Sequence, residues 1–82
     1  MRYVYILQCA DDTLYTGITT DLERRVIEHN TSGKWATYTK GKRPVVLVRT
    51  EQLSSRSDAS AREYEIKKMT REQKFKLIQQ TD

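Results

Sequence analysis

YVYILQCADDTLYTGI, residues 3–18, contains two runs of strand-forming residues with a short polar segment between them. The valine, isoleucine and tyrosine residues of both runs favour β-strands. Residues 10–13, Ala-Asp-Asp-Thr, are typical of a turn. We therefore expect a β-hairpin that brings the phenols of Tyr5 and Tyr15 near each other.

The residues after the hairpin predict a helix and then a strand. Thr20 with Glu23 three residues later forms a capping-box pattern that predicts the helix start. The Thr-Ser-Gly of residues 31–33 predicts its end. Pro44 opens a strand over residues 45–48, whose unbroken apolar run favours burial on both faces and a central position in the sheet.

A second helix is expected to follow a polar loop. Residues 52–57 are loop-like, and the helix should start near Ser57 or Ser60 and run to about Met69.

A last helix follows, because Thr70 and Gln73 repeat the capping-box pattern. Its Phe75 and Ile78 are expected to close the core. The order β-β-α-β-α-α predicts an α+β fold, a small three-stranded antiparallel sheet flanked by helices. At 82 residues, we expect one domain over 1–82.

Composition limits the class of protein. With 37% hydrophobic and 32% charged residues, the chain is typical of a soluble globular protein. Its longest aliphatic run, residues 45–48, is far shorter than the roughly 20 apolar residues of a membrane span. Cys9 is the only cysteine, which excludes an internal disulfide and fits a reducing cytoplasm. We expect Cys9 to be a small apolar core residue.

A basic, aromatic segment indicates a polyanionic partner. The net charge is +4, and residues 34–44 contain four cations and two aromatic side chains. Cations neutralise phosphates and aromatic rings stack on bases. A solvated loop anchored in the core by Trp35 is an equally open reading. The residues expected to contact nucleic acid are Lys34, Tyr38, Lys40, Lys42 and Arg43.

Two helical faces carry polar groups beside apolar ones. Arg25 and His29 are four residues apart, so they share a face. In the second predicted helix, Glu63 shares a face with the apolar Ala59 and Ile66. A carboxylate near the core requires a partner. That partner is either an arginine or a metal ion.

These residues together resemble a known family, the GIY-YIG nuclease domain, and within it the small stand-alone bacterial subgroup (UPF0213). The resemblance extends from Met1 to about Ile78. The chain departs from the family pattern at Tyr3, where glycine is common, and at Thr16, where isoleucine is common. The matching elements, in order, are Tyr3-Val4-Tyr5, Tyr15-Thr16-Gly17, Arg25 and His29 within residues 21–30, and Glu63 within residues 62–68.

The resemblance implies a nuclease acting on DNA, with a role in DNA repair or recombination. Phosphodiester hydrolysis needs an aimed water, charge relief at the phosphoryl oxygens and proton transfer. Glu63 is expected to hold one Mg²⁺ or Mn²⁺ ion, and Arg25 to bind phosphate. The sequence lacks the clustered carboxylates of a two-metal site.

The aromatic residues are expected to handle protons and position the reactants. Tyr5, its pKa lowered by nearby cations, would accept the proton of the attacking water, and His29 would share in the relay. Tyr15 would orient the water or the phosphate. Gly17 either allows close approach at the site or marks a bulge or strand end.

Other functions remain open from the sequence. A non-catalytic nucleic-acid-binding module explains the basic segment equally well, and a protein-interaction adaptor explains it least. No glycine-rich phosphate loop is present, so no nucleotide cofactor is expected. No helix beyond the nuclease core is evident for reading bases. We therefore expect weak sequence specificity, with selection by DNA structure or by a protein partner.

Overall fold

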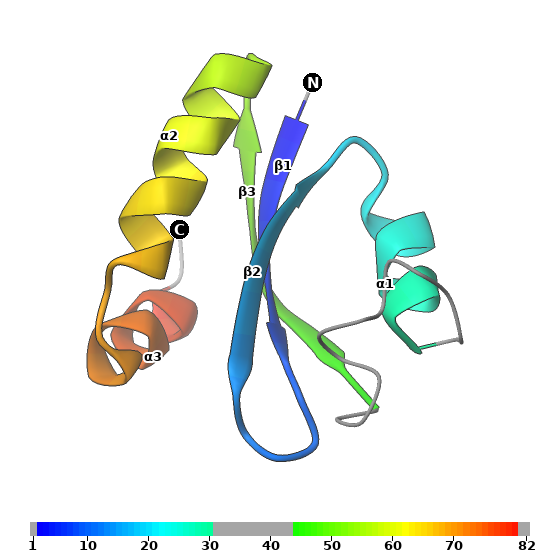
Figure 1. Cartoon of the computed structure of the whole chain (residues 1–82), viewed down its shortest axis with the longest axis vertical. Helices are drawn as coiled ribbons and strands as arrows, with labels where there is room; N and C mark the ends of the chain where they lie inside the picture. Colours follow the sequence, from blue (N-terminus) through cyan, green and yellow to red (C-terminus); the bar gives the residue numbers. More distant parts are fainter. Residues whose placement is uncertain (1, 31–43, 81–82) are drawn as a thin grey trace.

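The computed structural model describes residues 2–30 and 44–80, which form three strands and three helices in the predicted order (Figure 1). The elements are β1 (Arg2–Gln8), β2 (Leu14–Thr19), α1 (Leu22–Asn30), β3 (Val46–Leu53), α2 (Arg56–Lys67) and α3 (Arg71–Gln79).

The predicted hairpin is confirmed. Strands β1 and β2 pair antiparallel, with Tyr5 opposite Gly17 and Leu7 opposite Tyr15. Asp12 adopts a φ of 67° in the turn, a conformation that aspartate tolerates better than most residues. Because side chains alternate between the faces of a strand, Tyr5, Tyr15 and Gly17 lie on one face of the sheet.

The predicted central position of the third strand is wrong. The sheet order is β2-β1-β3, so β1 is central and β3 lies at an edge. The residues buried on both faces are those of 4–7 in β1, each at most 2% exposed. In the apolar run of residues 45–48, Val45 is buried before the strand begins, whereas Val46 is 59% exposed. An apolar run is compatible with a central strand or an edge strand. Strand β3 is an edge strand because it pairs with β1 along one side.

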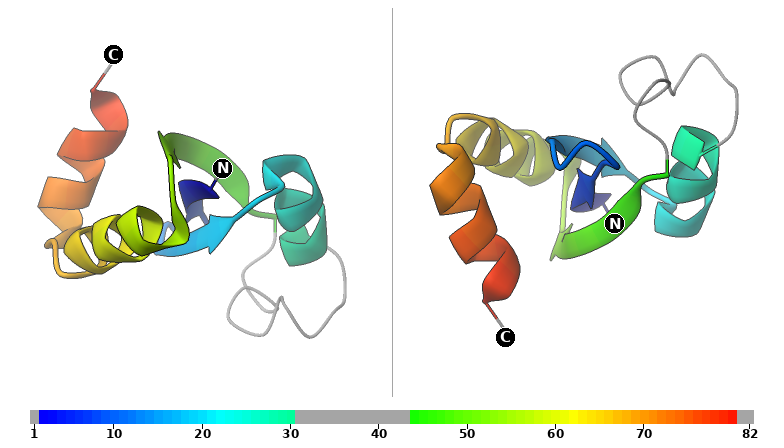
Figure 2. Two further views of the ribbon diagram at one scale, coloured as in Figure 1. Left: turned by 90° about the horizontal axis from the view of Figure 1, so that it is seen from above. Right: turned by 90° about the horizontal axis from the view of Figure 1, so that it is seen from below.

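Helices cover both faces of the sheet. Figure 2 shows α2 and α3 on one side and α1 on the other. Val4 and Ile6 of β1 face α2 and α3, where they join Ala59, Ile66 and Leu77 in one core cluster. The second cluster, on the α1 side, contains Tyr5, Leu7, Cys9 and Val45, with Leu22 and Val26 of α1 packed against it. Cys9 is buried there, as predicted.

Two predicted helix starts differ from the structure. Helix α1 is capped by Asp21 rather than Thr20, because the Asp21 carboxylate accepts the Arg24 backbone N–H at 3.1 Å. Helix α2 begins at Arg56, earlier than predicted, since the Ser55 hydroxyl accepts the Asp58 N–H at 3.1 Å.

The end of β3 and the end of α2 also differ from the prediction. Gln52 and Leu53 belong to β3, so the predicted loop over residues 52–57 is shorter. Helix α2 ends at Lys67, two residues before the predicted Met69.

Helix α3 has the predicted capping box. The Thr70 hydroxyl accepts the Gln73 N–H, and the Gln73 side chain accepts the Thr70 N–H. Ile78 packs against the core cluster as predicted. However, Leu77 is the buried residue of this helix, and Phe75 is half-buried with the Arg71 guanidinium 5.0 Å from its ring centre.

An ion-pair network ties β3 to α2. The Arg62 guanidinium donates to both oxygens of Glu51, at 2.6 and 3.0 Å, and Arg49 donates to the same carboxylate at 2.9 Å. Hydrogen bonds from Arg62 lower the pKa of Glu51 against the opposing effect of burial, and Arg49 adds to the lowering. Arg49 also donates to the Leu77 carbonyl, which connects the network to α3.

The departure from the family pattern at Thr16 leaves one group unsatisfied. Thr16 is 4% exposed, and its hydroxyl oxygen has no hydrogen-bond partner within residues 2–30 and 44–80. A buried hydroxyl in this state is destabilising.

Asn30 closes the gap between α1 and β3. Its side-chain amide donates to the Val45 carbonyl at 3.1 Å and accepts the Val45 N–H at 2.8 Å.

Among the helices in the described ranges, none combines the length and apolar character needed to cross a membrane.

Candidate active site

Three of the predicted site residues meet on the α1 side of the sheet. The Tyr5 hydroxyl lies 3.2 Å from Nε2 of His29, at hydrogen-bond distance. The ring centres of Tyr15 and His29 are 5.0 Å apart, and those of Tyr5 and Tyr15 are 6.3 Å apart. His29 is 1% exposed and Tyr5 is 2% exposed. The hairpin thus supplies both phenols, and the last turn of α1 supplies the imidazole.

Gly17 provides space for the Tyr5 ring. A Cβ atom at position 17 would lie 2.6 Å from Cζ and 3.1 Å from Cε1 of Tyr5, and closer still to its hydroxyl oxygen. These separations are well below the normal contact distance of carbon atoms. Of the two readings drawn from the sequence, close approach is therefore the one that the geometry supports, and the approaching group is the Tyr5 side chain.

The expected direction of the Tyr5 pKa is wrong. Burial of the phenol is the largest effect and raises its pKa above the ordinary value of 10.0, and Tyr15 raises it further. Arg25 lowers it, but less than burial raises it. Desolvation disfavours the charged phenolate, so Tyr5 is a neutral phenol at physiological pH.

The pKa of His29 shifts in the opposite direction, downward. Burial and the nearby Arg25 charge both lower the pKa of His29 from its ordinary value of 6.5, and Glu28 opposes them. A lowered pKa keeps the imidazole neutral at neutral pH, with one ring nitrogen able to accept a proton. His29 is therefore better prepared than Tyr5 to act as the base of the pair.

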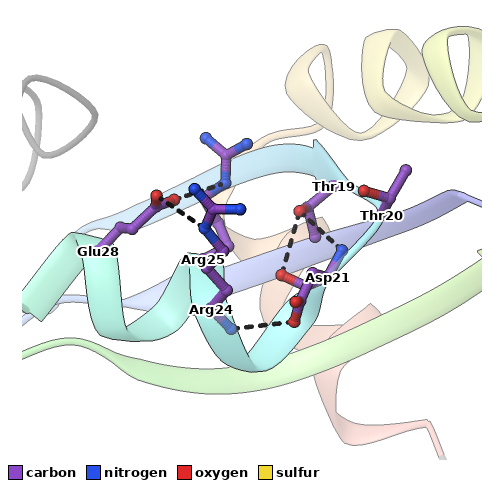
Figure 3. Close-up of a pocket in the computed structure, with 6 residues that line it drawn as sticks. All are labelled: Thr19, Thr20, Asp21, Arg24, Arg25 and Glu28. Atoms are coloured by element: carbon purple, nitrogen blue, oxygen red, sulfur yellow. Dashed lines mark hydrogen bonds and ion pairs between the residues drawn. The ribbon is translucent and has the colours of Figure 1, made fainter.

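Arg25, whose charge acts on Tyr5 and His29, lines a surface pocket (Figure 3). The pocket has a volume of about 230 Å³. Its lining residues are Thr19, Thr20, Asp21, Arg24, Arg25 and Glu28.

Sequence reasoning missed Glu28 at this site. One Glu28 oxygen lies 3.4 Å from Nε of Arg24, and the other lies 3.5 Å from Nε of Arg25. The available signal was the spacing, since residues three and four apart are neighbours on a helix surface. Arg24, the residue before Arg25, lines the same pocket, although its side chain is 76% exposed.

Glu63 lies on α2, which covers the face of the sheet opposite α1. As predicted, it shares a helical face with the buried Ala59 and Ile66, and its own side chain is 24% exposed. The partner that the structure shows for it is a lysine, Lys67, with Nζ 3.3 Å from Oε2. The Glu63 charge acts on the Tyr5 hydroxyl, as does that of Arg25. The two charges act on this phenol in opposite directions, since Arg25 lowers its pKa and Glu63 raises it.

The donor set fits a lightly held magnesium ion. Within residues 2–30 and 44–80, no three His, Cys, Asp or Glu side chains group into a metal site. An ion held by Glu63 would take water and substrate oxygens as most of its other ligands. Mg²⁺ binds in this way, because it retains waters and favours one or two carboxylates plus phosphate oxygens.

The residues predicted to bind nucleic acid cannot be placed. They lie in 31–43, outside the described residues, together with the predicted helix end at residues 31–33 and with Trp35. Lys34, Tyr38, Lys40, Lys42 and Arg43 therefore remain predictions from the sequence.

A model of the GIY-YIG catalytic domain matches residues 1–76. The chain belongs to the GIY-YIG family. This is a nuclease family, and membership supports endonuclease chemistry in general terms.

Similar curated proteins include several UPF0213 proteins. That of Staphylococcus haemolyticus is 56% identical over 96% of this chain and 95% of its own length. That of Natronomonas pharaonis is 55% identical over 94% of this chain and 89% of its own length.

Solved structures agree with the fold. The solution structure of the UPF0213 protein BH0048 from Bacillus halodurans matches with a TM-score of 0.61 and 47% identity, covering 95% of this chain and 83% of the other. The solution structure of the protein EF2693 from E. faecalis has the same TM-score at 38% identity, covering 93% of this chain and 81% of the other.

Proposed function

We propose that this protein is a divalent-metal-dependent endonuclease that hydrolyses phosphodiester bonds in DNA. One observation carries the proposal: two phenols and a neutral imidazole lie in contact, and the charges of Arg25 and Glu63 both act on one of those phenols. Packing of a small core does not need this combination of groups. Phosphodiester hydrolysis uses each of them.

Arg25 binds the scissile phosphate. Its guanidinium is permanently charged, and its planar fork matches two phosphoryl oxygens. The side chain is 24% exposed at the edge of an open pocket, so a phosphate has access to it. There it stabilises the negative charge that increases on the phosphoryl oxygens during attack.

Tyr5 and His29 move the proton of the attacking water. When Nδ1 of His29 carries its proton, Nε2 accepts the Tyr5 hydroxyl proton across the 3.2 Å hydrogen bond. Tyr5 then takes a proton from the water as its own passes to the imidazole, and it need not exist as a free phenolate. Tyr15, whose ring lies against His29, orients the water or the phosphate.

Glu63 holds the metal ion. Its salt-bridge partner Lys67 is 53% exposed, so this contact is weak and solvated and would leave the carboxylate available to a divalent ion. When bound, Mg²⁺ or Mn²⁺ supplies positive charge at the phosphoryl oxygens and the leaving oxygen.

Cleavage assays test this function. Purified protein is incubated with single-stranded, duplex and branched DNA, with and without Mg²⁺ or Mn²⁺. Glu63→Gln should reduce the rate at least about 100-fold, because metal ions contribute several kcal/mol to such reactions. Glu65→Gln is the matched control, since Glu65 is an exposed carboxylate on the same helix.

Two outcomes would change the proposal. Cleavage that survives at the wild-type rate in both Glu63→Gln and Arg25→Ala would come from a contaminating enzyme. Salt-dependent DNA binding without turnover under any metal would favour a non-catalytic binding module.

Substrate selection is proposed to follow DNA structure, or a protein partner, in cytoplasmic DNA repair or recombination. Phosphate contacts from the basic segment around residues 34–43 position a backbone but carry no base information. Cut sites should therefore vary little among random duplexes and differ between duplexes, forks and flaps. A tight consensus sequence at the cut sites would contradict this selection rule.

A further inference from the structure

Glu28 places a negative charge between the two arginines of the pocket. Each of its carboxylate oxygens faces the Nε of one arginine, at 3.4 Å for Arg24 and 3.5 Å for Arg25. Figure 3 shows all three side chains on the wall of the same pocket. The carboxylate is 22% exposed, so it is held at the surface and not enclosed in the core.

The two contacts are replaceable. Both separations are longer than the 2.7–2.9 Å of a strong charge-assisted hydrogen bond, and Arg24 is 76% exposed. Ion pairs between such groups contribute little net stability. A phosphate offers oxygens in the bidentate geometry that arginine prefers, with at least the same charge as a carboxylate.

The Glu28 charge also acts on Tyr5 and His29. Arg25 and Glu28 act in opposite directions on Tyr5 and on His29. The carboxylate therefore offsets the field of Arg25 where the reaction is proposed to occur, and its withdrawal would restore that field.

We propose that Glu28 is an internal competitor for the arginine pair, and that a substrate phosphodiester displaces it to be held by Arg24 and Arg25 together. This inference rests on the proposed function, because it takes a nucleic-acid phosphate as the ligand. Arg24 thereby becomes a phosphate-binding residue, and Glu28 weakens binding of anions that cannot engage both arginines.

DNA binding measured without turnover tests the competition. Fluorescently labelled single-stranded and duplex oligonucleotides are titrated with protein in EDTA at low ionic strength, and anisotropy gives Kd. Glu28→Gln keeps the shape of the side chain and removes its charge. It should lower Kd about fivefold relative to wild type, as expected when a partly exposed ion pair no longer opposes binding.

Glu23→Gln is the matched control. Glu23 is an exposed glutamate on the same helix but does not line the pocket, and its substitution changes net charge equally. It should lower Kd by less than about twofold, because solvent and salt screen its charge. In a background in which Arg24 and Arg25 are both replaced by glutamine, Glu28→Gln should increase DNA affinity no more than Glu23→Gln does.

Each outcome decides the role of Glu28. A Kd for Glu28→Gln equal to that of Glu23→Gln would reduce Glu28 to a surface partner of the helix, and a higher Kd would make it a support for the arginines. Glu28→Ala should agree in sign with Glu28→Gln, and circular dichroism checks that both are folded. Absence of binding by every variant also contradicts the proposal.

The binding assay separates this inference from the nuclease assignment. If the protein never cleaves DNA, but the Glu28→Gln variant binds it more tightly than the Glu23→Gln variant, the competitor role of Glu28 stands and the nuclease assignment is refuted. If the wild-type enzyme cleaves DNA but Glu28→Gln binds it no more tightly than Glu23→Gln does, the nuclease assignment stands and the role of Glu28 as a competitor is refuted.

Discussion

Replacing Gly17 with alanine should disable the site by displacing Tyr5. Gly17 does not have a positive φ angle, so its backbone conformation is open to alanine. The obstacle is space alone. The new Cβ would lie 2.6 Å from Cζ of Tyr5, and carbon atoms pack at about 3.5 Å or more. The ring must therefore move by about 1 Å.

Both stability and activity should fall. Tyr5 is 2% exposed, so its ring cannot shift without disturbing the core. Overpacking of this kind costs about 1–3 kcal/mol, and the preference of a strand for alanine over glycine offsets at most about 1 kcal/mol. The displaced hydroxyl loses its 3.2 Å contact with His29. A misplacement of this size can reduce the rate about 100-fold.

A second background isolates the cause. Leucine at position 5 lacks the hydroxyl oxygen and the two ring carbons that the new methyl group would meet. In Tyr5→Leu protein, Gly17→Ala should therefore be neutral, or stabilising by up to about 1 kcal/mol. Urea denaturation followed by far-UV circular dichroism gives the four free energies of unfolding, and DNA cleavage gives the rates. An equal loss of stability in both backgrounds, or a Gly17→Ala enzyme with wild-type rate and stability, would refute the steric argument.

Three further predictions follow from individual contacts. Glu51→Gln should lower the free energy of unfolding by about 2 kcal/mol at neutral pH, because Arg49 and Arg62 then lack their common anion. Folding lowers the pKa of Glu51, so the wild-type protein has its full extra stability above the unfolded-state pKa and loses it as pH falls through the folded-state pKa. If the denaturation midpoints of wild type and Glu51→Gln stay apart in acid, this explanation is contradicted. Thr16→Val should raise the free energy of unfolding by about 1 kcal/mol, because it removes a buried hydroxyl without a partner, and a lower midpoint in urea would show that the hydroxyl is satisfied. His29 is the only histidine, so an NMR titration of its ring is unambiguous; its midpoint should lie below 6.5, with the acidic limb of the cleavage rate at the same pH, and a midpoint above 6.5 would remove His29 as the base.

Local patterns predicted the hairpin and the last helix well. The β-branched and aromatic runs around an aspartate-containing turn led directly to the β1–β2 pair. The Thr70–Gln73 pattern led to a complete capping box. In both cases the interacting groups are a few residues apart in the chain, so short-range geometry settles them.

The same kind of pattern failed where two readings were locally equivalent. Thr20 and Asp21 are both good N-cap residues, and the structure shows that Asp21 is the one that accepts the first-turn N–H. The apolar run at residues 45–48 resembled a central strand, but β1 occupies the centre because it alone pairs on both edges. Strand order is a property of the assembled sheet.

By itself, the sequence determined which chemical groups this protein has and where each falls in the helices and strands. Residue spacing placed Arg25 beside His29, and Glu63 on the face of Ala59 and Ile66, because helical periodicity follows from covalent geometry. Tertiary structure decided what those groups do to one another. It buried Tyr5 over Gly17, reversed the expected direction of its pKa, and gave Arg25 the neighbouring charge of Glu28. Desolvation and Coulomb interactions depend on distance through space and on exclusion of water, and neither exists until the sheet and its helices have packed together.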